Sequence, residues 1–181
     1  MIDIKTFFEQ SEGKWFTQRT RYDLAQRKVE NGKAELTVEL LGEDNDTVIA
    51  LYNQGKSSLN SDSAQAESLS DLAGAKISWD NQSEGEQGSS AIVLLPEDQQ
   101  WQKGQFIQKV LNSESSLKTG YFLMGEDEAL TLSTENNSNG VIKERLWFAH
   151  PNLRLRTVWQ ENETGHQGWV MFYSEIRRLN A

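Results

Sequence analysis

Two arginines alternate with two leucines in the segment Leu153-Arg154-Leu155-Arg156. In a β-strand the arginines would share one face and the leucines the other. Either the leucines build the core while the arginines lie in water, which is the commoner arrangement because arginine is rarely buried without a partner, or the arginines line a cavity. In the second arrangement each guanidinium could pair bidentately with a carboxylate, which would suit a ligand that carries two carboxylate groups.

A carboxylate lies one strand length before this pair. Glu144 is separated from the arginines by the turn residues His150-Pro151-Asn152, so a hairpin would bring it to the same rim or cavity. There it could form a salt bridge with Arg154 or Arg156. If it is instead removed from water, its pKa could rise and it could share a proton with a nitrogen-rich ligand.

Tryptophan is the second candidate binding group. The chain has six tryptophans, and most are expected to be core or surface anchors. Trp79 differs because the segment Ala75-Lys76-Ile77-Ser78-Trp79-Asp80 ends at a polar loop. A tryptophan at a strand end can form the lip of a pocket and stack on a planar ligand.

Composition excludes several classes of function. The 181 residues suit a single domain, 1–181. The net charge of -9 disfavours a surface that binds the phosphate backbone of a nucleic acid, so no nucleic-acid partner is expected. The sequence has no apolar run of about 18 residues or more, and its opening residues lack the pattern of an export signal. We therefore expect a cytoplasmic protein without membrane insertion.

Cysteine is absent, which excludes disulfides, thiolate metal ligands and a cysteine nucleophile on this chain. Any thiol that takes part in the function must come from another molecule. The two histidines, His150 and His166, lie beside turn residues and are expected in solvent. No metal site is predicted.

The elements that must position these residues follow from periodicity. Ile4, Phe7 and Phe8 at helical spacing, with Asp3 before them, predict a helix over 2–9, and a second short helix is expected over 44–53 with an aspartate at its cap. Alternation then predicts a hairpin of strands 15–27 and 33–41 around an Asn-Gly turn at 30–32. A polar loop is expected over 57–71.

Eight further strands are predicted from alternation and turn signals. They span 75–81, 90–95, 105–111, 118–124, 129–135, 141–149, 153–161 and 168–178. With the first hairpin they make ten, which predicts an all-β fold with short helices, closed or nearly closed into an antiparallel β-barrel. A barrel of about eight strands or more can enclose one small ligand.

Four segments of the sequence resemble a known family. They are Gly13-Lys14-Trp15-Phe16-Thr17-Gln18-Arg19-Thr20, Ile77-Ser78-Trp79, the stretch from Glu144-Arg145-Leu146-Trp147-Phe148-Ala149 to Arg154-Leu155-Arg156, and Ser174-Glu175-Ile176-Arg177. Together they resemble the S-type phycobiliprotein lyases and their U-type companions from end to end. The third segment is long and unusual enough to be specific.

The resemblance implies a ten-stranded lipocalin-like barrel that forms a single bilin-binding domain. Such a lyase binds an open-chain bilin such as phycocyanobilin without a covalent bond and passes it, as a thioether, to a cysteine of an apo-phycobiliprotein subunit. The bilin is the substrate, so no cofactor is implied. A homodimer, or a heterodimer with a related lyase subunit, is also implied.

The resemblance also assigns roles to residues. Arg154 and Arg156 would anchor the bilin propionates or orient the bilin, and Glu144 would interact with the pyrrole nitrogens, so these three are the predicted catalytic residues. The residues predicted to bind the bilin are Arg19, Tyr22, Asp23, Trp79 and Trp147.

Two departures from the family pattern leave the catalytic role open. Many S-type members carry a histidine pair where this chain has Tyr22 and Asp23, and a second tryptophan after the Ser-Trp pair is missing from 81–86. These changes resemble a U-type subunit that works only with an S-type partner. The sequence is also consistent with a bilin carrier without catalysis, or with a barrel that only binds a protein.

Overall fold

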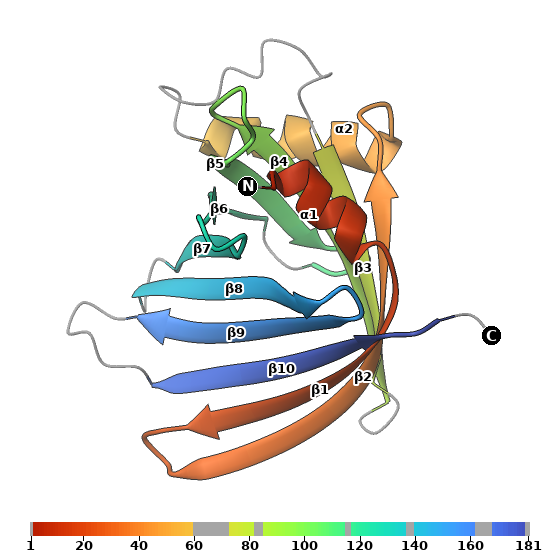
Figure 1. Ribbon diagram of the computed structural model, residues 1–181. Coiled ribbons are helices and arrows are strands. Elements are labelled where there is room, and N and C mark those ends of the chain that lie inside the picture. The colour runs from red at the N-terminus through yellow and green to blue at the C-terminus, as the bar shows by residue number, and fades with distance from the viewer. Residues whose placement is uncertain are drawn as a thin grey trace.

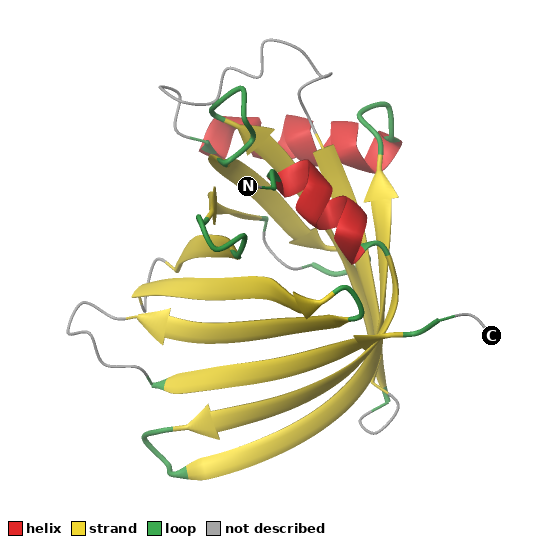
Figure 2. Ribbon diagram, in the orientation of Figure 1, coloured by secondary structure: helices red, strands yellow, loops and turns green. Residues whose placement is uncertain are grey.

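Ten antiparallel strands close into one barrel in the part of the chain that the computed structural model describes, which is residues 2–59, 73–81, 85–114, 117–136, 140–161 and 168–179. The strands are β1 (Gly13–Asp23), β2 (Lys28–Leu41), β3 (Ala73–Asn81), β4 (Glu86–Pro96), β5 (Lys103–Val110), β6 (Lys118–Met124), β7 (Leu130–Asn136), β8 (Gly140–His150), β9 (Leu153–Glu161) and β10 (Trp169–Arg177). Each strand pairs with its neighbour in sequence, and β10 returns to pair with β1 (Figures 1 and 2). The predicted ten-stranded antiparallel barrel is confirmed.

The first hairpin turns earlier than predicted. Asn31 and Gly32 lie inside β2, and the turn occupies residues 24–27. The side chain of Asp23 accepts a hydrogen bond from the backbone N–H of Gln26 at 2.9 Å, and Arg27 supplies the positive φ of 54° that was expected of the Asn-Gly pair. The prediction of a turn at 30–32 was therefore wrong.

Two helices accompany the barrel, and both lie at the end away from the β1–β2 turn (Figure 1). Helix α1 (Ile4–Ser11) begins at Asp3, whose Oδ1 accepts from the N–H of Thr6 at 2.7 Å. Helix α2 (Asp46–Gly55) is capped by Asn45 rather than by an aspartate, since the Asn45 side chain accepts from Thr47 N–H at 2.9 Å.

The predicted polar loop over 57–71 lies mostly outside the described residues. Its first residues belong to a short 3₁₀ helix, η1 (Lys56–Ser58). Among the described residues, no helix has the length and apolar character needed to cross a membrane.

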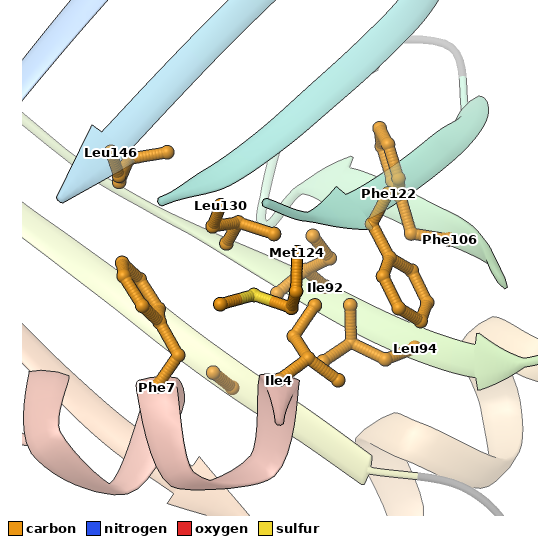
Figure 3. Packing of buried hydrophobic residues seen from close by; sticks show 10 residues of the cluster. Ile4, Phe7, Ile92, Leu94, Phe106, Phe122, Met124, Leu130 and Leu146 are labelled. Atoms are coloured by element: carbon orange, nitrogen blue, oxygen red, sulfur yellow. The ribbon is translucent and has the colours of Figure 1, made fainter. Parts of the chain in front are cut away.

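The core is divided between the inside and the outside of the barrel. Helix α1 inserts Ile4 and Phe7 among inward-facing side chains that include Ile92, Met124 and Leu130 (Figure 3). Helix α2 covers the outside of β4 and β5, where its Val48 and Leu51 pack on Ala91, Val93, Leu95 and Ile107. Strand β4 is thus buried on both faces, and α1 fills one part of the barrel interior while the rest stays open.

Candidate functional site

The paired arginines point into the barrel. Arg154 is only 6 % exposed, and Arg154 and Arg156 both line an interior cavity. Leu153 and Leu155 lie on the opposite face of β9 by strand alternation. The commoner arrangement, with solvated arginines and leucines in the core, is therefore wrong for this strand.

The cavity has a volume of about 480 Å³, which is within the range of small-molecule sites. Phe7, Phe8 and Ser11 of α1 line one part of it. The walls come from strands on all sides of the barrel. The polar and aromatic side chains in the lining include Thr17, Arg19, Trp79, Asn81, Ser90, Gln108, Glu144, Arg154, Arg156 and Tyr173.

A buried carboxylate holds the arginine pair in place. Glu175, on β10, is fully buried, and its Oε2 accepts a hydrogen bond from Arg154 Nε at 2.5 Å. Its Oε1 lies 3.4 Å from Arg156 Nε, an ion pair without hydrogen-bond geometry. Burial opposes ionisation of this carboxyl, but the attraction of Arg156 and then Arg154 outweighs burial and lowers the pKa of Glu175 below its ordinary value.

Arg156 has a second anionic partner and an aromatic neighbour. Its Nη1 donates to Glu144 Oε1 at 3.1 Å, and its guanidinium lies 3.8 Å from the centre of the Tyr173 ring. Burial alone would lower the pKa of Arg156, but Glu175 and Glu144 together raise it above its ordinary value. The group is therefore a permanent cation in the cavity wall.

Glu144 occupies the position that the hairpin argument predicted. It lines the cavity from β8 and forms the salt bridge with Arg156, which was one of the two roles expected for it. Its exchange of a proton with a ligand stays a prediction. Because its side chain is 28 % exposed, it can contact a molecule in the cavity while it remains paired.

Arg19 and Trp79 also line the cavity. In the barrel register Arg19 lies beside Tyr173, which in turn lies beside Arg156, so three strands present one row of side chains. Trp79 lines the wall formed by β3 and packs on the cluster of Trp15, Leu36 and Val38. The structure thus brings together five of the eight residues predicted for the site.

The other three do not line the cavity. Tyr22 lies on the outer face of β1, 39 % exposed, with its ring edge-on to Phe172. Asp23 ends β1 and caps the following turn. Trp147 faces outward because alternation turns the neighbouring Leu146 and Phe148 inward. The prediction that these three contact a ligand in the cavity has no support in the geometry.

Sequence reasoning missed Glu175 and Tyr173. Glu175 belongs to one of the quoted family segments, but no role was predicted for it. A signal was available, because β10 follows β9 directly and a carboxylate on an adjacent strand can pair with a buried arginine.

The charge of the cavity differs from that of the whole chain, which is -9. The basic residues in the lining are Arg19, Lys33, Lys109, Lys118, Arg154 and Arg156, and the acidic ones are Glu86 and Glu144. The ammonium of Lys109 points away from the cavity and donates to Gln54 Oε1 at 3.3 Å. The buried carboxylate of Glu175 neutralises one further positive charge of the lining. A positive excess remains, which favours an anionic ligand. Among the described residues, no group of three or more His, Asp or Glu side chains is arranged to hold a metal.

A closed antiparallel barrel with an aromatic and cationic cavity has the lipocalin-like architecture, which can enclose a small ligand. Comparison with known proteins identifies the family within this class. The CpeS-like protein family matches residues 3–178, and the chain belongs to that family. The family resemblance predicted from the sequence segments is confirmed.

Curated relatives support the same assignment. "Chromophore lyase CpcS/CpeS" of Thermosynechococcus vestitus is 40% identical over 97% of this chain and 93% of the relative. "Chromophore lyase CpcS/CpeS 1" of Trichodesmium erythraeum is 35% identical over 99% of this chain and 100% of the relative. The solved S-type phycobiliprotein lyase CPES from Guillardia theta superposes with a TM-score of 0.71 over 99% of this chain and 95% of that chain, at 20% identity, which shows the shared fold.

Proposed function

We propose that this chain is a phycobiliprotein chromophore lyase that binds an open-chain bilin non-covalently in the barrel cavity. It assists thioether attachment of the bilin to a cysteine of a phycobiliprotein subunit. The observation that carries the proposal is the placement of Arg154, Arg156 and Glu144 in one cavity lining, in a chain whose relatives are chromophore lyases.

The two arginines suit the two propionates of a bilin. Glu175 contacts each arginine at its Nε, so the terminal nitrogens of both guanidiniums are the atoms left to meet a ligand carboxylate or Glu144. Such hydrogen bonds between charged groups are stronger than hydrogen bonds between neutral groups. The propionates would therefore fix the orientation of the bilin along the cavity.

Two facing walls of the cavity, on β3 and β8, suit the flat rings of the ligand. In the closed strand order β3 and β8 lie opposite each other, because four strands separate them in either direction. Trp79 on β3 offers an aromatic face, while Glu144 on β8 offers a carboxylate to pyrrole N–H groups. A conjugated pigment would lie between these two side chains.

The reaction is an addition that needs a thiol from elsewhere, because this chain has no cysteine. The acceptor sulfur bonds to the exocyclic ethylidene carbon of ring A, and the proton goes to the ring carbon of the same double bond, so no group leaves. The chain contributes by holding the bilin in one geometry and presenting ring A to the thiolate. Proton sharing between Glu144 and the pyrrole nitrogens would make the ethylidene carbon more electrophilic.

A second candidate is a subunit that binds bilin but attaches it only with an S-type partner, or a carrier without catalysis. The absence of the histidine pair of many S-type members, at whose place this chain has Tyr22 and Asp23, favours it. The oligomeric state and the cytoplasmic location stay predictions.

The test combines the purified chain, phycocyanobilin and an apo-phycobiliprotein subunit, with and without an S-type lyase, and measures the bilin that stays on the acceptor after denaturation. A yield above the spontaneous reaction with the chain alone supports the lyase. A yield with both proteins that exceeds the yield of the S-type lyase alone, while the chain alone gives no rise, supports the heterodimer. Covalent yield at the spontaneous level in both mixtures rejects catalysis, and a spectral change on mixing with bilin would then identify a carrier.

A further inference from the structure

Gly88, on β4, lies directly opposite Trp79 in the β3–β4 pair. A methyl group at Gly88 would lie 2.7 Å from Trp79 Cε2 and 3.1 Å from Nε1, and it would come closer still to Cζ2. Real Cβ atoms essentially never have a heavy atom within 3.0 Å, so the contacts with Cζ2 and Cε2 could not form without a shift. The indole therefore lies over the backbone of β4, in space that every residue with a Cβ atom would fill.

Backbone conformation does not account for the glycine. Gly88 is not among the positive-φ glycines of the described residues, which are Gly13, Gly85 and Gly140. Glycine inside a strand is unfavourable, and its usual reasons are a bulge or the close approach of another group. At Gly88 the approaching group is the side chain that forms one wall of the cavity.

Two other glycines in the barrel have aromatic rings against them, and they show what purely structural packing looks like. Gly104 lies against Phe122, and Gly120 lies against Phe106. Both rings are part of the buried core, with exposures of 2 % and 1 %. Trp79 differs because it lines the cavity and is only half-buried.

We propose that Gly88 is a specificity-determining residue, because it recesses the Trp79 indole into the wall and so sets the width of the slot, meaning the part of the cavity in front of the indole. The inference rests on the proposed bilin-binding function and adds the part of the ligand that the slot selects, namely flat conjugated rings. Any larger residue at position 88 would push the indole off β4 and into the cavity by about 1 Å or more to restore van der Waals contact. The slot would then be narrower, which would disfavour flat rings stacked on the indole.

The test compares Gly88→Ala with Gly168→Ala, a control in which the added methyl meets no heavy atom within 4 Å. We expect Gly88→Ala to fold and to bind phycocyanobilin about tenfold more weakly, as overpacking costs of this size imply, while Gly168→Ala binds like the wild type. In a Trp79→Phe background, which replaces the fused indole by a single phenyl ring and so removes the ring atoms Cε2 and Cζ2, the effect of Gly88→Ala should shrink. Such coupling in a double-mutant cycle marks the two residues as acting together on the ligand.

Crystal structures of the wild type and Gly88→Ala give a readout that needs no ligand. We expect the indole to move away from β4 and into the cavity in the variant, and an unmoved indole overturns the inference. A variant that loses stability but binds bilin with wild-type affinity in its folded fraction also overturns it. If the wild type itself gives no spectral change with phycocyanobilin, the proposed function fails, and the indole position still decides the role of Gly88.

Discussion

Glu175 accepts a hydrogen bond from Arg154 Nε at 2.5 Å, and both side chains are almost fully withdrawn from solvent. The same carboxylate lies 3.4 Å from Arg156, so one buried anion serves two cations of the cavity wall. Removing one partner of a buried ion pair leaves an uncompensated charge, which is the costly outcome for such pairs. Glu175 is therefore a determinant both of stability and of the direction in which the arginines point.

Glu175→Gln should lower the free energy of unfolding by about 3 kcal/mol, the scale for breaking a buried pair. Urea denaturation at neutral pH measures this loss. Glu35→Gln, which breaks the exposed pair with Arg178, is the matched control and should change stability by about 1 kcal/mol or less. Equal effects of the two substitutions would contradict the buried-pair argument.

The stability of the wild type should depend on pH through the same carboxyl group. The pKa of Glu175 is lower in the folded chain than the ordinary value of a glutamate, so the folded state holds fewer protons on this group than the unfolded state does. Its contribution is complete above the unfolded pKa and is lost as pH falls below it and through the folded pKa. Urea midpoints between neutral pH and about pH 3 should fall more steeply for wild type than for Glu175→Gln. Parallel curves would exclude this assignment.

Arg156→Ala should weaken phycocyanobilin binding by about tenfold or more, since a charge-assisted hydrogen bond contributes about 1.5 to 3 kcal/mol. An absorbance titration measures the affinity, and circular dichroism checks the fold. Arg145→Ala is the matched control, because Arg145 pairs with Asp127 and is not part of the cavity lining. An affinity for Arg156→Ala equal to that of the control would place the ligand elsewhere.

Glu144→Gln separates binding from chemistry. The amide keeps the size of the side chain and can still accept a hydrogen bond from Arg156, so the affinity for bilin should stay within about threefold of wild type. The rate of attachment to the acceptor should fall by about 100-fold, the lower range for loss of a proton-transfer group. Single-turnover measurements of covalent bilin give this rate. A normal rate would reduce Glu144 to a salt-bridge partner.

The two predicted tryptophans should behave differently. Trp79→Leu removes the aromatic face from the cavity wall and should weaken bilin binding by about 1 kcal/mol, or roughly fivefold. Trp147→Leu alters the outer face and should leave the affinity unchanged, because Trp147 does not line the cavity. Bilin titrations of both variants measure the two affinities. A loss confined to Trp147→Leu would mean that the ligand binds outside the barrel.

The barrel could be predicted from the sequence because its strands obey simple rules. Alternation located most strands within a few residues, and antiparallel strands joined by short turns have few arrangements besides a meander. The Asn-Gly pair misled the prediction, because Asp23 and Arg27 form a turn of their own several residues earlier. Local turn preference was overridden by another local interaction.

The site was harder to predict because it depends on partners far apart in sequence. Alternation groups Arg154 with Arg156 but does not say which face is inside. The deciding partner, Glu175, comes 21 residues after Arg154, on another strand. Trp147 was predicted to bind the bilin, although alternation with the inward Leu146 could have placed it outside.

The pairing of β10 with β1 has a consequence for how the molecule matures in the cell. Strand β10 leaves the ribosome after the nine strands before it, and it both closes the barrel and brings Glu175 and Tyr173 to the arginines. A nascent chain that lacks this strand has an open sheet edge and two arginines without their main counter-ion. If the cavity binds bilin as proposed, competence to hold the pigment should therefore appear only once β10 has been made.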